Sequence, residues 1–189
     1  SLTYTDYKNL YKNKQIIKEN FDSSQIRPSS LDLTLSDECY EIKYSFLSPK
    51  NMVRDKLENL VLKKINLQKS HIFRINKTYI IKLNERLNLK NNILGHCNPK
   101  SSTGRLDIFC RTIVDYTDEY EKIPKNYCGE IFLEVTSRSF NIKLKSGDKL
   151  NQLRLVSKKH VFLSDKELIK LNKKNKIIFP TNNSHIKIE

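Results

Sequence analysis

The most informative stretch of the chain reads Asn98-Pro99-Lys100-Ser101-Ser102-Thr103-Gly104-Arg105. It combines a proline, a glycine, two cations and three adjacent hydroxyl groups in one predicted turn. Anions such as phosphate bind where N–H, O–H and cationic donors converge on a preset backbone. The stretch therefore predicts a phosphate-binding turn.

A single carboxylate, Glu134, lies inside the apolar run 131–135. If this run is a β-strand, its odd-numbered residues point into the core, and Glu134 and its even-numbered neighbours point toward a cleft or a partner subunit. The alternative is an ordinary strand glutamate that faces solvent. A donor cluster together with an isolated, half-buried acid favours a nucleotide enzyme over a passive binding module.

Composition narrows the class of protein. The 189 residues are 38% hydrophobic and 30% charged, which is enough for one folded domain and not typical of a disordered tail. The net charge of +14 suits a polyanionic ligand such as a triphosphate, or nucleic acid. Because the lysines are scattered and no Arg-rich arm occurs, we favour a compositional bias plus a small polyanion over nucleic acid.

The cysteines and the apolar runs indicate the cellular compartment of the protein. Cys39, Cys97, Cys110 and Cys128 stand apart, without a C-x-x-C spacing, and are expected to be reduced thiols of a cytoplasmic protein. His96 next to Cys97 lacks a second ligand pair, so no metal site is expected. No apolar run approaches the roughly 20 residues that span a bilayer, and the first twenty residues do not resemble a secretory leader.

Periodicity predicts a mainly β sandwich or barrel with an N-terminal helix and one or two short helices. We expect an amphipathic helix over 4–20, a strand from Leu31 and a short helix over 51–59. Further strands are predicted at 61–67, 71–75, 78–83, 93–97, 107–114, 130–136, 139–145 and 150–156. A basic helix is predicted over 164–175.

Several segments, in order, resemble the motifs of the trimeric dUTPase and dCTP deaminase superfamily. They are Gln25–Leu33, Pro99–Arg105, Tyr127–Glu134 and Gly147–Leu153. The string from Asn98 to Asp107 is most similar to a bacterial subgroup of dCTP deaminases that carries two such domains in tandem, so this chain resembles the first half of such a protein.

The resemblance implies a dUTPase-like β-barrel (β-clip) fold and three segments. These are an N-terminal helix and linker (1–24), a nucleotide-binding domain (25–160) and a basic helix or tail (161–189), which is alternatively a linker to a second domain. It also implies a homotrimer or pseudo-trimer that binds dCTP, dUTP or dTTP, with Mg²⁺ carried by the triphosphate.

The activity implied is hydrolysis of the amidine C–N bond of dCTP to give dUTP and ammonia, without zinc. The H-x-E and P-C-x-x-C signature of zinc deaminases does not occur in the sequence. By resemblance, Glu134 is the general base, and Arg105 and Ser101 complete the catalytic set. The implied nucleotide contacts are Lys100, Ser101, Ser102, Thr103, Gly104, Arg105, Phe132, Leu133 and Gln152.

Other positions have more open roles. Asp32 and Gln152 are expected to hold loops together or to contact phosphate, Gly147 to serve a hairpin turn, and Gly129 to allow a close backbone approach. Relatives carry an Asp just before the aromatic-x-Gly segment, where this chain has residues 123–126 without one. Asp115 or Asp118 could supply that sugar contact.

Three alternatives remain open from the sequence. The chain could be a dUTP diphosphatase or a bifunctional deaminase-diphosphatase, although it lacks the Gly-rich phosphate lid of dUTPases. It could be a non-catalytic nucleotide-binding half whose partner domain carries turnover. The weakest alternative is a basic nucleic-acid-binding protein.

Overall fold

The computed structural model describes residues 1–157 and 163–175. The chain divides into two units, residues 1–158 and 159–189, and each is described by itself. In the second unit the described element is α4 (Asp165–Asn175). Ser164 and Glu167 cap its N-terminus through reciprocal backbone and side-chain hydrogen bonds. The helix predicted over 164–175 is therefore confirmed.

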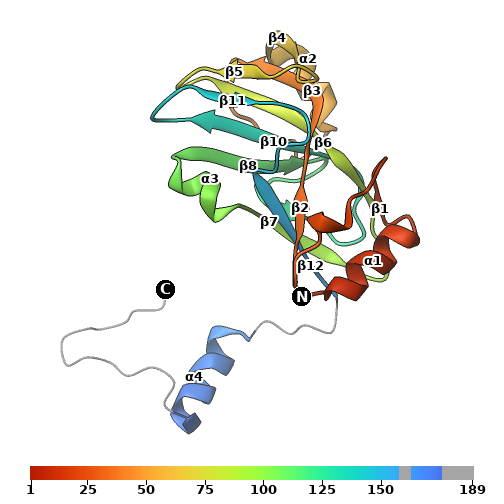
Figure 1. Cartoon of the computed structure of the whole chain (residues 1–189). Helices are drawn as coiled ribbons and strands as arrows, with labels where there is room; N and C mark the ends of the chain where they lie inside the picture. The colour runs from red at the N-terminus through yellow and green to blue at the C-terminus, as the bar shows by residue number, and fades with distance from the viewer. Residues whose placement is uncertain (158–162, 176–189) are drawn as a thin grey trace, which may run out of the picture. The chain divides into compact units, whose positions relative to one another are not determined.

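The described part of the first unit consists mainly of antiparallel strands, as predicted (Figure 1). Its largest sheet has the order β4 (Val61–Asn66), β3 (Leu35–Ile42), β6 (Thr78–Asn88), β10 (Cys128–Ser137) and β8 (Ile108–Val114), and β1 (Ile16–Ile17) also pairs with β6. A second sheet has the order β2 (Leu31–Leu33), β12 (Asn151–Val156), β7 (Leu94–Pro99) and β9 (Lys122–Ile123). β11 (Ile142–Leu144) pairs with β5 (His71–Phe73).

Four short helical segments complete this unit. They are α1 (Tyr4–Lys12), the 3₁₀ segment η1 (Ser23–Gln25), α2 (Val53–Leu60) and α3 (Ser101–Arg105). Each predicted strand is present with shifted ends, and the largest shift is in β6, which continues to Asn88. The segment 98–105 was predicted as a turn. In the structure its last five residues form the short helix α3.

The N-terminal helix was predicted too long. It ends at Lys12, because Lys14 takes a left-handed conformation with a φ of 54° and the chain reverses there. Ile16 and Ile17 then pair with Leu87 and Arg86 of β6, so residues that fit a helical period belong to a sheet. Tertiary pairing outweighs local periodicity in this segment.

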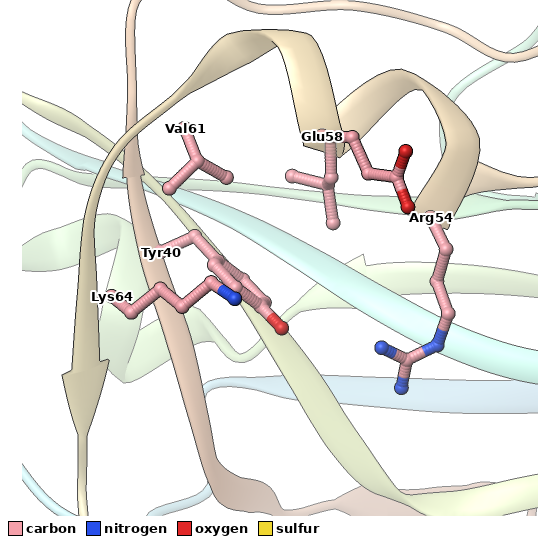
Figure 2. A pocket seen from close by; sticks show the side chains of 6 residues that line it. Tyr40, Arg54, Glu58, Val61 and Lys64 are labelled. Carbon is pink, nitrogen blue, oxygen red and sulfur yellow. The ribbon is translucent and has the colours of Figure 1, made fainter.

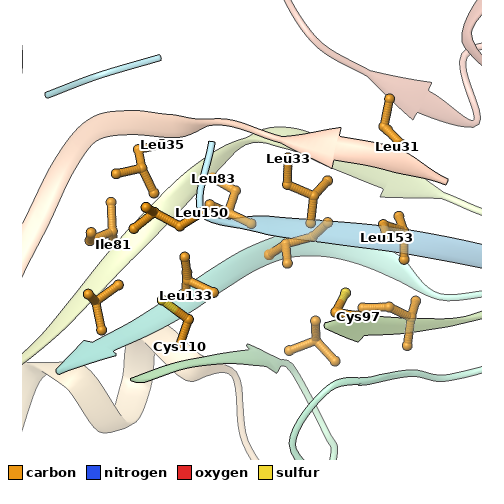
Figure 3. Close-up of a cluster of buried hydrophobic side chains, with 14 of the residues drawn as sticks. Leu31, Leu33, Leu35, Ile81, Leu83, Cys97, Cys110, Leu133, Leu150 and Leu153 are labelled. Atoms are coloured by element: carbon orange, nitrogen blue, oxygen red, sulfur yellow. The ribbon is translucent and has the colours of Figure 1, made fainter. Parts of the chain in front are cut away.

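The main core lies between the sheets (Figure 3). It includes Leu33 of β2, Leu133 of β10 and Leu153 of β12, all essentially inaccessible to solvent. A smaller core forms on the other face of the large sheet, where α2 packs its Leu57 against Phe132 of β10. Both faces of β10 are thus covered near Phe132. Glu134, two residues further along the strand, lies on the same face as Phe132.

Two glycines have the roles predicted for them. Gly147 has a φ of 90°, which a turn beside Asp148 requires and which L side chains rarely adopt. At Gly129 an added Cβ would lie 2.7 Å from Cζ of Tyr127 and 3.1 Å from a carboxylate oxygen of Asp115. The backbone therefore comes closer to Tyr127 at this point than a larger residue would allow.

Among the described helices, none has the length and apolar character needed to cross a bilayer.

Candidate active site

Glu134 occupies the middle of β10, where it pairs with Ile80 of β6 on one side and with Arg111 of β8 on the other. Its odd-numbered neighbours belong to the main core, as strand alternation predicted. Glu134 itself is only 1% exposed, so the alternative of a solvent-facing strand glutamate is wrong. A carboxylate at this depth needs a compensating partner.

Arg111 supplies that partner. Its Nε and Nη2 atoms lie 2.9 and 2.5 Å from Oε1 of Glu134. The guanidinium carbon lies 3.9 Å from the ring centroid of Tyr120 and 5.0 Å from that of Phe109, and Nη2 also donates to Oγ of Ser45 at 3.2 Å. Arg111 was not predicted as a site residue. A cation in a predicted strand was the available signal, but its pairing with Glu134 depends on the register of two strands.

The other carboxylate oxygen of Glu134 is buried and has no hydrogen-bond partner among the described residues. Native proteins pair nearly all buried polar atoms, so an orphan acceptor is rare and requires an explanation. An oxygen of this kind can accept a proton or a hydrogen bond from a ligand or a water molecule.

This carboxylate lines a polar cavity of about 430 Å³. Basic and acidic side chains, hydroxyl groups, one amide and one aromatic ring line it. The lining residues are Ser45, Asn76, Thr78, Asp107, Phe109, Arg111, Glu134, Thr136 and Arg138. Burial, followed by the nearby Glu134 carboxylate, raises the pKa of Tyr120, whose ring covers Arg111. Such a cavity can hold a small polar molecule against a general acid–base group.

The predicted phosphate-binding turn follows the end of β7, and none of its residues lines the Glu134 cavity. Lys100 forms the N-cap of α3, and its Nζ lies 2.6 Å from Oδ2 of the buried Asp32. Arg27 contacts the same oxygen through Nε at 3.0 Å. Gln152 pairs with Asp32 on one side and with Asn98 on the other, so the structure brings this motif residue to the same place.

The residues of α3 differ in accessibility. Ser101, Ser102, Gly104 and Arg105 are exposed. Thr103 is buried, and its hydroxyl donates to the carbonyl oxygen of Leu150 at 3.0 Å, which anchors the helix. None of the five lines the Glu134 cavity, although the chain passes directly from α3 to Asp107 on the cavity wall. Figure 1 shows α3 at the edge of the sheet beside β8.

Of the other predicted contacts, Phe132 packs against α2 and Leu133 lies in the main core. Asp115 is buried, and its Oδ1 accepts a hydrogen bond at 2.7 Å from the backbone N–H of Val53, the first residue of α2. Asp118 is exposed. Neither aspartate lines the Glu134 cavity.

A second hollow of about 310 Å³ lies beside α2 (Figure 2). Tyr40 of β3, Lys64 of β4 and the helical Arg54 face it. The guanidinium of Arg54 is already bound by Glu38 and Glu130, at 2.8 and 2.5 Å. The guanidinium beside this hollow is therefore already paired with two carboxylates.

The cysteines are free, and three of them are buried. Burial raises the pKa of the Cys39 and Cys110 thiols to about 12. In the part of the chain that the structure describes, no group of three or more His, Cys, Asp or Glu side chains could hold a metal ion.

The antiparallel β fold and the buried glutamate–arginine pair in a polar cavity define a β-domain protein with a candidate acid–base centre. Comparison with known proteins identifies its family. Residues 2–159 match the family model described as 2'-deoxycytidine 5'-triphosphate deaminase N-terminal domain. The chain belongs to this family, which confirms the resemblance seen in the motifs.

Two relatives illustrate the relationship. A 2'-deoxycytidine 5'-triphosphate deaminase from Agrobacterium tumefaciens has a crystal structure that superposes with a TM-score of 0.82 at 35% identity, over 92% of this chain and 52% of that one. A protein of Coprothermobacter proteolyticus named "dCTP deaminase, dUMP-forming" is 27% identical over 135 residues, which is 69% of this chain and 67% of that protein. The chain thus spans about half the length of the A. tumefaciens protein.

Proposed function

We propose that the chain deaminates dCTP to dUTP and ammonia, with Glu134 as the general base. The observation that carries this proposal is the buried Oε2 of Glu134, an acceptor without a partner among the described residues, on a residue that lines a polar cavity. Membership of the deaminase family supplies the substrate class. The chain would then be a hydrolase that produces dUTP, a precursor in pyrimidine deoxynucleotide metabolism of the cytoplasm.

In the proposed reaction, Oε2 of Glu134 takes a proton from a water molecule while the water oxygen forms a bond to C4 of the cytosine ring. The ring π electrons move to N3, the Glu134 carboxylic acid passes its proton to N3, and C4 becomes tetrahedral. The regenerated carboxylate then takes the remaining proton of the C4 hydroxyl and delivers it to the amino group. The C4–N bond breaks, ammonia leaves, and the uracil carbonyl forms. Proton transfer by a positioned group typically contributes about 10²–10⁴-fold to a rate.

The triphosphate would bind at the turn that carries Lys100, Ser101 and Ser102, with Mg²⁺ carried by the phosphates. The net charge of +14 suits such a ligand. Because α3 does not line the cavity of its own chain, we propose that Ser101 and Arg105 reach Glu134 from a neighbouring copy or a second domain. A homotrimer or pseudo-trimer would bring the two parts together.

A second candidate is a bifunctional enzyme that carries dCTP to dUMP. The name of the C. proteolyticus relative favours this candidate. Both activities break the C4–N bond. The bifunctional enzyme also breaks a P–O bond of the triphosphate, which requires attack at phosphorus. The non-catalytic half remains a third candidate because the chain spans about half of the A. tumefaciens protein.

Product analysis separates the three candidates. The purified chain is incubated with dCTP or with dUTP in the presence of Mg²⁺, and nucleotides, ammonia and pyrophosphate are measured. The proposal predicts dUTP and ammonia from dCTP. Formation of dUMP, ammonia and pyrophosphate from dCTP supports the bifunctional enzyme. A thermal shift with dCTP but no product supports the non-catalytic half.

A further inference from the structure

The carboxylate of Glu134 is held asymmetrically. Both hydrogen bonds from Arg111 end on Oε1, at 2.9 and 2.5 Å, while Oε2 has no partner among the described residues. We propose that Arg111 is the positioning residue of the candidate base: it fixes Oε1 so that Oε2 is presented to the water and substrate. This inference rests on the proposed function and deepens it.

The grip on one oxygen restricts rotation of the carboxylate. Two donors of one rigid, planar guanidinium fix both the distance and the direction of the Oε1 contact. Rotation that brought Oε2 to the same donors would break the pair of bonds that now stabilises the buried charge. The unpaired lone pairs of Oε2 consequently keep one direction, as a base needs in order to meet its proton within hydrogen-bond reach.

Arg111 is itself held in place. Its guanidinium lies over the Tyr120 ring at 3.9 Å and near the Phe109 ring at 5.0 Å, and it donates to Ser45 at 3.2 Å. The hydroxyl of Tyr120 in turn donates to the carbonyl oxygen of Phe46 at 3.4 Å. Contacts from β8, from the segment before β9 and from the segment after β3 therefore converge on one cation. A supporting shell of this kind keeps a site at productive geometry.

Arg111 also fits this role better than Arg105, which was predicted to complete the catalytic set with Glu134 and Ser101. Arg105 is exposed on α3 and does not line the cavity of its own chain. Removing the partner of a buried charge leaves that charge uncompensated. The charged and titratable groups around Glu134 are Arg111 and Cys110 of β8, Tyr120, Asp107 and Arg138.

The test compares Arg111→Met and Arg111→Lys with the unaltered chain, and Arg86→Met serves as the matched control. Arg86 is an exposed cation of β6 that does not line the cavity. For each protein, kcat and KM for dCTP are measured, and circular dichroism verifies folding. If Arg111→Met does not fold, Arg111→Lys, which keeps the cation, carries the comparison.

The proposal predicts that Arg111→Met lowers kcat by about 10²–10³-fold, as removal of one preorganised donor does in other enzymes, with a much smaller change in KM. Arg111→Lys should lose less activity than Arg111→Met, and Arg86→Met should match the unaltered chain.

A wild-type kcat in Arg111→Met would overturn the proposal, and so would an effect confined to KM, which would make Arg111 a substrate contact. Should the unaltered chain not turn over dCTP, the proposed function fails, and the positioning role is tested without activity, by crystal structures of the unaltered chain and of Arg111→Met. A Glu134 carboxylate that is rotated or takes several orientations in Arg111→Met supports the positioning role, and an unmoved carboxylate contradicts it.

Discussion

At the residue scale, Lys100, the proposed phosphate contact, is held in place by a buried acid. Its Nζ lies 2.6 Å from the buried carboxylate of Asp32, which also holds Arg27. The carboxylate holds the side chains of Lys100 and Arg27 in place. Less side-chain entropy would therefore be lost when a triphosphate binds. Asp32 is thus explained as a support of the loop, one of the two roles that its motif suggested.

Replacement of Lys100 tests this contact. Phosphate contacts that are equally strong in the ground state and the transition state affect KM and leave kcat largely unchanged. We expect Lys100→Ala to raise KM for dCTP by about tenfold, equivalent to about 1.4 kcal/mol of binding. Steady-state kinetics measures both constants, with the exposed Lys143→Ala as control. An unchanged KM would show that Lys100 does not hold the triphosphate.

The residue scale also shows the limit of sequence reasoning. The face of β10 that carries Glu134 followed from strand alternation, because a period of two assigns each residue of a strand to a face. The partnership with Arg111 did not follow, because it needs the register of β8 against β10. Long-range packing sets that register, and a slip of one residue would send Arg111 to the opposite face.

At the element scale, α2 depends on a side chain from a distant loop. The carboxylate of Asp115 accepts the backbone N–H of Val53, one of the N–H groups that a helix start leaves unpaired. Asp115 was predicted as a possible sugar contact, and this capping contact accounts for its burial. The link joins α2 to the strand β8 that carries Arg111.

Loss of this cap should be measurable. We expect Asp115→Ala to lower the free energy of unfolding by about 1–2 kcal/mol, the usual cost of a lost helix cap. Urea denaturation measures the change. Asp118→Ala, at the exposed alternative position, should stay within about 0.5 kcal/mol of the unaltered chain. Equal stability of the two variants would contradict the capping role.

The ion pairs of Arg54 also connect elements, because this residue of α2 binds Glu38 of β3 and Glu130 of β10. Hydrogen bonding to Arg54 lowers the pKa of Glu130 in spite of partial burial. A carboxylate whose pKa is lower in the folded state stabilises the fold above its unfolded pKa of about 4.3. That contribution disappears as the pH falls through the folded value.

We therefore expect Arg54→Met to lower the free energy of unfolding by about 1 kcal/mol at neutral pH, a modest value because the partly exposed pair is screened by solvent. The difference from the unaltered chain should shrink as the pH falls below about 4, where the glutamates become protonated in both proteins. Denaturation at several pH values measures it. A difference that stays constant with pH would mean that Arg54 acts through packing alone.

Element boundaries were the least predictable feature of the fold. The positions of the longer strands followed from alternation and turn residues, so the mainly β class was predicted correctly, whereas the two-residue strands β1 and β9 were not predicted. The end of α1 was not, because the left-handed Lys14 and the pairing of Ile16 with Leu87 are set by contacts with residues far away in sequence. The helix α3 was hidden for a related reason, since Ser, Thr and Gly suit a turn as well as a short helix.

At the scale of the whole molecule, the candidate base and the candidate phosphate turn lie at separate places. Glu134 and Arg111 share a cavity, whereas Lys100, Asp32 and Gln152 gather where β7 ends. The proposed neighbour copy would complete each site with the exposed Ser101 and Arg105 of its own α3. Motif positions within one chain cannot reveal which copy supplies each residue.

Mixing of two inactive variants tests this arrangement. If Glu134 and Arg105 act from different copies, a mixture of Glu134→Gln and Arg105→Ala chains contains sites with both wild-type residues. We expect such mixtures, after dissociation and reassembly, to regain part of the dCTP deaminase activity that neither variant has alone. Size-exclusion chromatography verifies assembly. Mixed assemblies without activity would contradict a site shared between copies.

The most direct test of Glu134 as the general base is ammonia release from dCTP by the unaltered chain and by Glu134→Gln, together with dCTP binding by calorimetry. We expect stoichiometric dUTP and ammonia from the unaltered chain. We expect a loss of about 10²–10⁴-fold in rate for Glu134→Gln, the usual contribution of a general base, while dCTP binding is retained. Ammonia release at the same rate by Glu134→Gln would contradict the role of this carboxylate as the base.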